Sequence, residues 1–416
     1  MRQPGYCTIV GIISGTEERL AMRAGKITII AAAALAMMLT LAFTLAGCNG
    51  TQNQSSEGAQ VPQEATDAEI TTGYVNVVKD TNFNGIMLDM TEDEFADLGF
   101  ELGDSVDIVI DDTMYFENVP YYSGYFAATG ELLLVSYPGE PHPNFRRAQG
   151  TLWDDIDVTE NSRIQVTLRE RGAYLDTQEA LDMTYSNNRA DFTTDEEFAN
   201  FRSLTGGSLK QNLVYRSASP IDNTYLRASC ANKLVEQTGI AYSLDLSDNQ
   251  DEFAAEAAEA GSSCQYYIDL QAKGCVGLLD MNTSFGSSAN RQLLATALYN
   301  MCQHQGPYLV HCVEGKDRTG FVCMLIEALA GASEEELIRD YIITYDNYYN
   351  ITKANEPAKY DAVVNVKAKD MITTLRNAAD SSRTKTPTLK ECAEDYLKAG
   401  GLSAEQIAQI EATLCA

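Results

Sequence analysis

The feature that most constrains the fold of this 416-residue chain is a short apolar run, a polar loop and a second apolar run near residues 307–331. Residues 307–310 are typical of a short buried strand, and residues 321–330 are typical of a helix that ends at Gly331. The segment between them is His311-Cys312-Val313-Glu314-Gly315-Lys316-Asp317-Arg318-Thr319-Gly320. A loop between a strand and a helix N-terminus favours anions, because the helix dipole and its unpaired N–H groups attract negative charge.

The spacing of two residues in this loop indicates a phosphate site with its own nucleophile. Five residues separate Cys312 from Arg318, so one short loop can surround a phosphate with N–H groups and a guanidinium while a thiolate faces the phosphorus. The simpler interpretation is an inert buried thiol. The chain has only three histidines, and one of them stands beside this cysteine. The combination therefore favours a catalytic loop.

The loop resembles that of the cysteine-dependent protein tyrosine phosphatases, in the bacterial branch with a Gly-Lys-Asp-Arg-Thr-Gly centre. Residues 200–207 resemble the Asn-Phe-Arg-Asp-Leu-Gly-Gly segment of that branch, with Ser203 in place of the aspartate and Thr205 inserted. Residues 215–217 match its Tyr-Arg-Ser block, and residues 340–344 resemble the helix after the loop. In place of the usual Asp-Leu-Arg this chain has Asp245-Leu246-Ser247, which puts a second substrate-binding arginine in doubt.

The resemblance implies a phosphoric monoester hydrolase that acts on phosphotyrosine proteins or peptides, and in some members on phosphoserine or phosphoinositides. Cys312 would form a phosphocysteine intermediate, and Arg318 would bind the phosphate with its planar fork. The other loop residues are expected to contact the substrate or shape the loop, namely His311, Val313, Glu314, Gly315, Lys316, Thr319 and Gly320. His311 would orient the loop, Thr319 would assist the sulfur as leaving group, and the glycines would bring the backbone close to the phosphate. No cofactor is expected.

A carboxylic acid must protonate the leaving oxygen, and three aspartates are candidates. Asp317 is the first choice because related Lys-Asp-Arg loops use that position, and Asp245 and Asp248 are the alternatives. Asp317 could instead form an ion pair that shapes the loop, and Asp245 could be a helix or turn cap. A carboxylate at Glu314 should disfavour polyphosphorylated substrates, so we expect weaker activity on inositol phosphates than on phosphotyrosine peptides.

The N-terminal region predicts export. Arg23 and Lys26 precede an apolar run over residues 27–45, and small residues follow it up to Cys48. The Leu-Ala-Gly-Cys end resembles the lipobox of bacterial lipoproteins, which implies lipidation of Cys48; a transmembrane anchor is the alternative. Both interpretations tether the protein to the outer face of the cell membrane. Residues 1–47 are therefore predicted to be a lipoprotein signal peptide and residues 48–70 a flexible linker.

Composition limits the partners. The formal net charge of −29, from 59 acidic and 30 basic residues, argues against nucleic acid as a partner. The cysteines form no Cys-x-x-Cys pair and no metal-ligand spacing, so we expect no metal site.

The remaining chain divides into two predicted domains. Residues 71–172 contain alternating apolar runs and the only tryptophan, Trp153, and predict a small all-β domain. Residues 173–416 alternate strands with helices, which predicts an α/β phosphatase domain with a mainly parallel sheet flanked by helices. The cysteine loop should then lie at the C-terminal end of a central strand. The other functions considered are a phosphoinositide or inositol phosphate phosphatase, a sulfur-transfer protein, and a surface binding protein with a degenerate phosphatase domain.

Overall fold

The computed structural model describes residues 70–81, 84–137, 140–382 and 384–416. The predicted signal peptide, Cys48 and all but the last residue of the predicted linker lie outside these residues. Within the described ranges, no helix is both long enough and apolar enough to cross a membrane. All of these described residues belong to one structural unit.

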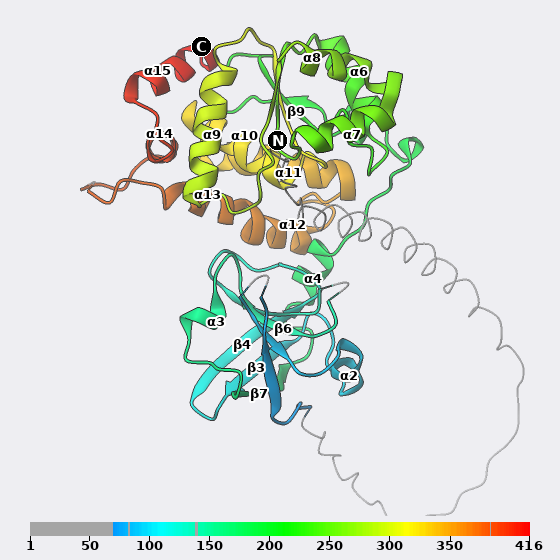
Figure 1. Cartoon of the computed structure of the whole chain (residues 1–416), viewed down its shortest axis with the longest axis vertical. Helices are drawn as coiled ribbons and strands as arrows, with labels where there is room; N and C mark the ends of the chain where they lie inside the picture. Colours follow the sequence, from blue (N-terminus) through cyan, green and yellow to red (C-terminus); the bar gives the residue numbers. More distant parts are fainter. Residues whose placement is uncertain (1–69, 82–83, 138–139, 383) are drawn as a thin grey trace, which may run out of the picture. The chain divides into compact units, whose positions relative to one another are not determined.

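The strands between residues 75 and 170 close into a barrel in the order β1-β2-β6-β5-β4-β3-β7, drawn in blue to green in Figure 1. Its elements are β1 (Val75–Lys79), β2 (Ile86–Leu88), α2 (Glu92–Asp97), β3 (Ser105–Ile110), β4 (Met114–Tyr122), β5 (Leu132–Val135), β6 (Asn144–Arg147), α3 (Leu152–Asp155) and β7 (Arg163–Glu170). Only β4 and β5 pair in parallel among the described barrel strands.

The barrel core follows from the alternation of apolar residues. Strand β3 pairs antiparallel with β7, and Ile108 lies opposite Val166 while Ile110 lies opposite Ile164. All four side chains are fully buried, because alternate residues of a strand point to the same face. Trp153 of α3 packs into the same core.

The second part of the chain contains a five-stranded sheet in the order β11-β10-β12-β9-β8. The strands are β8 (Arg202–Ser203), β9 (Val214–Ser217), β10 (Tyr242–Asp245), β11 (Val276–Leu278) and β12 (Tyr308–His311). Strands β9 to β12 are parallel, and β8 joins the edge antiparallel to β9. The predicted α/β fold is confirmed, and β12 lies between β10 and β9 in the interior of the sheet.

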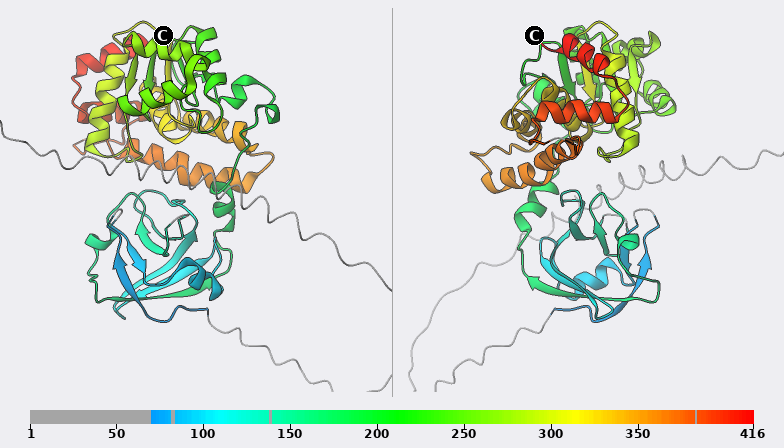
Figure 2. Two further views of the ribbon diagram at one scale, coloured as in Figure 1. Left: turned by 45° about the vertical axis from the view of Figure 1, so that its right-hand side comes forward. Right: turned by 90° about the vertical axis from the view of Figure 1, so that its left-hand side faces the viewer.

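Helices cover both faces of this sheet (Figure 2). Tyr308 and Val310 of β12 pack into one core with α9 and α10, whereas Leu309 packs into another with α6, α7 and α8. The helices before β12 are α4 (Leu175–Leu181), α5 (Asp195–Phe198), α6 (Ala228–Thr238), α7 (Gln250–Ala260), α8 (Gln265–Ala272) and α9 (Ser288–Met301). Those after it are α10 (Asp317–Leu329), α11 (Glu334–Tyr349), α12 (Pro357–Val363), a π-helical turn at Val364–Ala368, α13 (Lys369–Arg376), α14 (Leu389–Ala399) and α15 (Ala404–Leu414).

Helix α10 begins earlier than the apolar pattern predicts. Its first residue is Asp317 rather than Phe321, so the second half of the cysteine loop is already helical. From Thr319 to Leu329 every residue is buried, which is expected of a helix surrounded by other elements. Its N–H groups therefore open directly into the loop.

Candidate active site

The cysteine loop follows β12 and leads into α10, at the C-terminal ends of β9, β10 and β12. A cavity of about 320 Å³ opens there, lined by residues 281–283, residues 312–314, Asp317 and Arg318. Cys312 is 3% exposed, so its thiol is sheltered but borders the cavity. The structure thus brings the predicted nucleophile, the predicted phosphate ligand and the first-choice acid to the wall of one cavity.

The backbone of the loop is turned so that its carbonyl groups bond away from the cavity. The carbonyls accept hydrogen bonds as follows: Val313 O from Ser219 N (3.1 Å), Glu314 O from Tyr348 Oη (2.8 Å), and Gly315 O from Asn200 Nδ2 (3.0 Å) and Arg216 Nη2 (2.8 Å). The N–H groups of residues 313–316 donate no hydrogen bond to any described residue. A peptide plane with an engaged outer carbonyl leaves its N–H free for an anion, as in other phosphate-binding loops.

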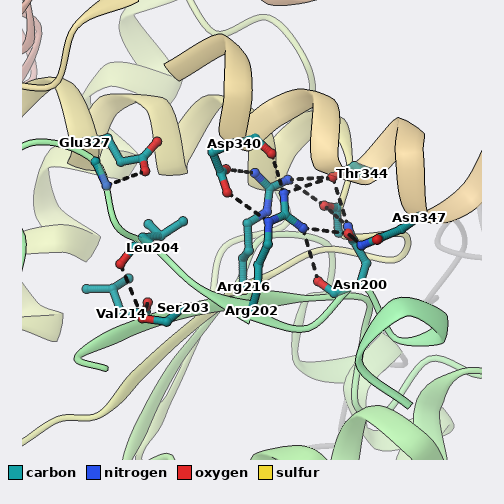
Figure 3. A network of polar contacts seen from close by, with 12 residues as sticks. Asn200, Arg202, Ser203, Leu204, Val214, Arg216, Glu327, Asp340, Thr344 and Asn347 are labelled. Carbon is teal, nitrogen blue, oxygen red and sulfur yellow. Dashed lines mark hydrogen bonds and ion pairs between the residues drawn. The ribbon is translucent and has the colours of Figure 1, made fainter. Parts of the chain in front are cut away.

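Arg216 is held by a buried ion-pair network (Figure 3). Asp340 of α11 accepts from Arg216 Nη1 and from Arg202 Nε at 2.9 Å, and its backbone oxygen accepts from Arg202 Nη2 at 2.6 Å. Burial acts to raise the pKa of Asp340, but the two arginines outweigh it and hold that pKa below its usual range. The network fixes the arginine that braces Gly315.

Two glycines of the loop are required for different reasons. Gly315 has φ +67°, and a Cβ there would lie 2.2 Å from the carbonyl oxygen of Ser217, so the loop backbone runs against β9. A Cβ on Gly320 would lie 2.6 Å from the Tyr341 ring. Gly320 therefore makes room for α11, whereas the sequence had suggested that it brings backbone close to the phosphate.

Arg318 and Thr319 keep their polar groups uncommitted. Arg318 forms no ion pair within the described part of the chain, and its one hydrogen bond runs from Nη1 to the Met281 carbonyl at 3.4 Å. The Thr319 hydroxyl is buried without a hydrogen-bond partner among the described residues. Unpaired buried polar groups are rare in folded proteins and often mark a functional site.

Asp317 lies in the cavity wall, and the two alternative acids do not. Tyr341 Oη donates to Asp317 Oδ1 at 2.8 Å. Burial acts to raise the pKa of Asp317, but Lys316, Lys367, this hydrogen bond and Arg318 together hold it below its usual range. Asp245 is fully buried and accepts from the Ser247 N–H and hydroxyl, so it caps a turn. Asp248 is 3% exposed and does not border the cavity.

His311 lies behind the loop, not in the cavity. Its ring is fully buried and contacts the Tyr267 hydroxyl, which donates to Ser243 Oγ at 3.0 Å. Burial lowers the pKa of His311 to about 4, so the ring is neutral at physiological pH. The residue supports the loop from beneath, and direct contact with a substrate is not available to it.

Lys316 and Glu314 form an ion pair at the rim of the loop. Lys316 Nζ lies 3.2 Å from Glu314 Oε1 and 3.5 Å from the Tyr349 hydroxyl. Burial works against the charge of Lys316, but Glu314 and Asp317 keep its pKa well above the usual value. Of this pair, Glu314 borders the cavity and Lys316 does not.

The cysteine side chains of the described residues form no disulfide bond. Cys230, Cys264, Cys275, Cys302, Cys312, Cys323, Cys392 and Cys415 are all free thiols. Across the described ranges, no group of three or more histidine, cysteine or acidic side chains is placed to hold a metal ion.

Several residues that hold the loop were not predicted. They are Tyr185, Asn200, Arg216, Tyr341 and Tyr348. Asn200, Arg216 and Tyr341 belong to the segments that resemble the family. The sequence therefore marked these segments, but it did not indicate that these side chains contact the loop. Tyr185 and Tyr348 had no signal in the sequence beyond being aromatic.

Among the described residues, the loop after the central strand β12 combines free N–H groups, a cysteine and an arginine without an ion pair at one cavity. This combination places the domain in the class of α/β domains that bind phosphate. The sequence model of the tyrosine phosphatase family matches residues 195–416, more than half of the chain, and the chain belongs to this family. Among solved structures, the core catalytic domain of the PP-IP phosphatase SIW14 from S. cerevisiae, in complex with citrate, is similar. The similarity is 18% identity over 43% of this chain and 91% of that chain, with a TM-score of 0.24. No curated protein matches this sequence.

Proposed function

We propose that residues 195–416 hydrolyse phosphomonoesters through a phosphocysteine intermediate on Cys312, with phosphotyrosine in a protein or peptide as the substrate. The observation that carries the proposal is the set of free donors around Cys312. The N–H groups of residues 313–316 have no acceptor among the described residues, and the Arg318 guanidinium has only the weak contact with the Met281 carbonyl. Such donors hold a phosphoryl group and the charge that develops on it during transfer.

In the first step the Cys312 thiolate attacks phosphorus, forming the S–P bond as the bond from phosphorus to the tyrosine oxygen breaks. Arg318 and the N-terminus of α10 neutralise the equatorial oxygens. Asp317 gives its proton to the departing phenolate. In the second step water attacks phosphorus, the S–P bond breaks, Asp317 takes the proton from the water, and inorganic phosphate leaves.

Asp317 must be protonated to act as the acid, although nearby cations hold it ionised in the free site. A bound phosphate dianion changes this balance, because it engages Arg318 and places negative charge beside the carboxylate. Both effects raise the pKa of Asp317. The proton needed for the leaving group is therefore favoured only when substrate is present.

The position of Glu314 supports a singly phosphorylated substrate. Its side chain borders the cavity beside Cys312 and adds a carboxylate to the rim. A second phosphate group on the same substrate would meet this negative charge. We therefore propose phosphotyrosine rather than inositol phosphates as the preferred substrate. Phosphoinositides are the alternative substrates against which activity on phosphotyrosine should be compared.

Hydrolysis of an aryl phosphate by the purified protein tests the proposal. C312S should lower kcat/KM by more than about 10³-fold, because the nucleophile is lost. C275S is the matched control, since Cys275 is another free thiol outside the cavity. Equal activity of C312S and the parent protein would exclude the phosphocysteine mechanism.

The N-terminal sequence is the basis for a proposal on the location of the protein. We infer that Cys48 is lipidated and that the domain is held at the outer face of the cell membrane. The support is the basic start, the apolar run over residues 27–45 and the Leu-Ala-Gly-Cys end, all outside the described residues.

A further inference from the structure

Glu314 is fixed from two sides at the rim of the cavity. Tyr185 Oη donates to Glu314 Oε1 at 2.5 Å, and Lys316 Nζ lies 3.2 Å from the same oxygen. Glu314 thus pairs with the ammonium group of Lys316, which also contacts the Tyr349 hydroxyl at 3.5 Å. Tyr185 belongs to the segment before α5, 129 residues away along the chain.

Tyr185 is itself held firmly. Its ring stacks on Tyr348 with centroids 4.6 Å apart, and the Arg227 guanidinium lies 4.7 Å from its centroid. Arg227 is 1% exposed and donates to the Ser186 carbonyl and the Asn187 side chain, which tie down the segment that carries Tyr185. The hydroxyl therefore has little freedom to leave Glu314.

The position of Tyr185 sets it apart from the family signal. The residues that match the tyrosine phosphatase family begin at Asp195, so Tyr185 lies outside them. The contact with Glu314 is therefore made by a residue that precedes the part of the chain matched by the family.

We propose that Tyr185 is a specificity-determining residue that locks Glu314 onto Lys316 and so excludes substrates with a second anionic group beside the reacting phosphate. Such a group would have to displace Glu314 from Lys316 and would meet a fixed carboxylate. The inference rests on the proposed function, since it concerns which phosphoesters the same site accepts.

The surface next to Glu314 is also negatively charged. A second cavity of about 800 Å³ shares Tyr185, Tyr348 and Tyr349 with the rim of the site. The acidic residues that line it are Asp182, Asp191, Glu197 and Asp346, and its described lining contains no basic residue. An anionic extension of a substrate is repelled on this side as well, whereas lysine or arginine beside the phosphotyrosine is tolerated.

Inhibition constants separate this role from general packing. The probes are inorganic phosphate, which needs only the cradle, and inositol hexakisphosphate, which also reaches the rim. The quantity compared is the ratio of the inhibition constant of inositol hexakisphosphate to that of inorganic phosphate. E314Q should lower this ratio by roughly tenfold, which is the effect of about one unit charge at a partly screened site. Y185F keeps the ring and removes only the hydroxyl, and should shift the same ratio in the same direction by a smaller factor.

A double-mutant cycle tests whether Tyr185 acts through Glu314. In the E314Q background Y185F should cause no further change in the ratio, because the carboxylate that it positions is gone. Y225F is the matched control: the Tyr225 ring lies 5.7 Å from that of Tyr185, and no hydrogen bond joins it to Glu314 within the described residues. It should leave the ratio unchanged.

The failure of this inference differs from the failure of the proposed function. An unchanged ratio in Y185F, or a shift that persists in E314Q, would overturn the role of Tyr185. If the protein hydrolyses no aryl phosphate, the proposed function fails, and calorimetric titration of the two anions into the same variants still decides the role of Tyr185.

Discussion

Tyr341 of α11 donates its phenolic hydroxyl to the Asp317 carboxylate at 2.8 Å. The bond joins a helix 24 residues downstream to the proposed acid, and it is one of the interactions that lower the pKa of Asp317. Because Gly320 leaves room for the same ring, the loop motif and α11 are matched to each other.

Removing this hydroxyl should move the pH dependence of catalysis upward. The hydrogen bond stabilises the ionised carboxylate, so Y341F raises the pKa of Asp317 and leaves it protonated at higher pH. The first step needs the protonated form, so the alkaline limb of kcat/KM should move to higher pH. The profile is best measured with phosphotyrosine, whose leaving group needs the proton. An activated aryl phosphate serves as the control and should respond less; an unchanged limb with phosphotyrosine would contradict the role of Asp317.

The ion pair between Arg216 and Asp340 predicts a stability effect. Arg216 is fully buried, so D340N would leave its charge without the carboxylate that compensates it. We expect a loss of about 3–5 kcal/mol in the free energy of unfolding, as for other broken buried pairs. Urea unfolding followed by circular dichroism measures it.

The matched control lies on the same helix. Asp346 is exposed, and D346N should change the free energy of unfolding by less than about 0.5 kcal/mol. Equal unfolding midpoints for D340N and D346N would mean that the pair contributes nothing to stability.

Gly315 predicts a loss of activity through backbone displacement. In G315A the new Cβ would clash with the Ser217 carbonyl, so the loop must move. Its N–H groups would then no longer point toward the bound phosphate. A displacement of this kind should lower kcat/KM by about 100-fold or more. G331A separates clash from strain, since Gly331 has φ +82° with open space around it. It should cost about 1–3 kcal/mol of stability and little activity; equal activity losses in both variants would argue against the clash.

The fold was predictable where the pattern is local. Tyr308, Leu309 and Val310 form an apolar run that is typical of a strand buried on both faces, and it lies inside the parallel sheet. The start of α10 was misplaced because Asp317 and Arg318 are polar, and their side chains serve the loop although their backbone is helical. Barrel closure and the strand orders depend on pairings between distant segments, which apolar periodicity does not encode.

The site was predictable to the same extent. Cys312 and Arg318 were singled out by their spacing, and Asp317 by the resemblance to related loops; all three share one short loop and border one cavity. The contacts of Tyr185 and Arg216 with the loop span 129 and 99 residues, and no spacing rule links them. Their function depends on which atoms the folded chain brings together.

The single tryptophan allows the two parts of the protein to be followed by different spectroscopic signals. Trp153 lies in the barrel core, and residues 195–416 contain no tryptophan, whereas tyrosines surround the cysteine loop. Selective excitation of indole fluorescence therefore reports the barrel alone, and tyrosine absorbance reports chiefly the rest. A melting experiment recorded in both channels will show directly whether the two parts unfold as one cooperative unit or in separate transitions.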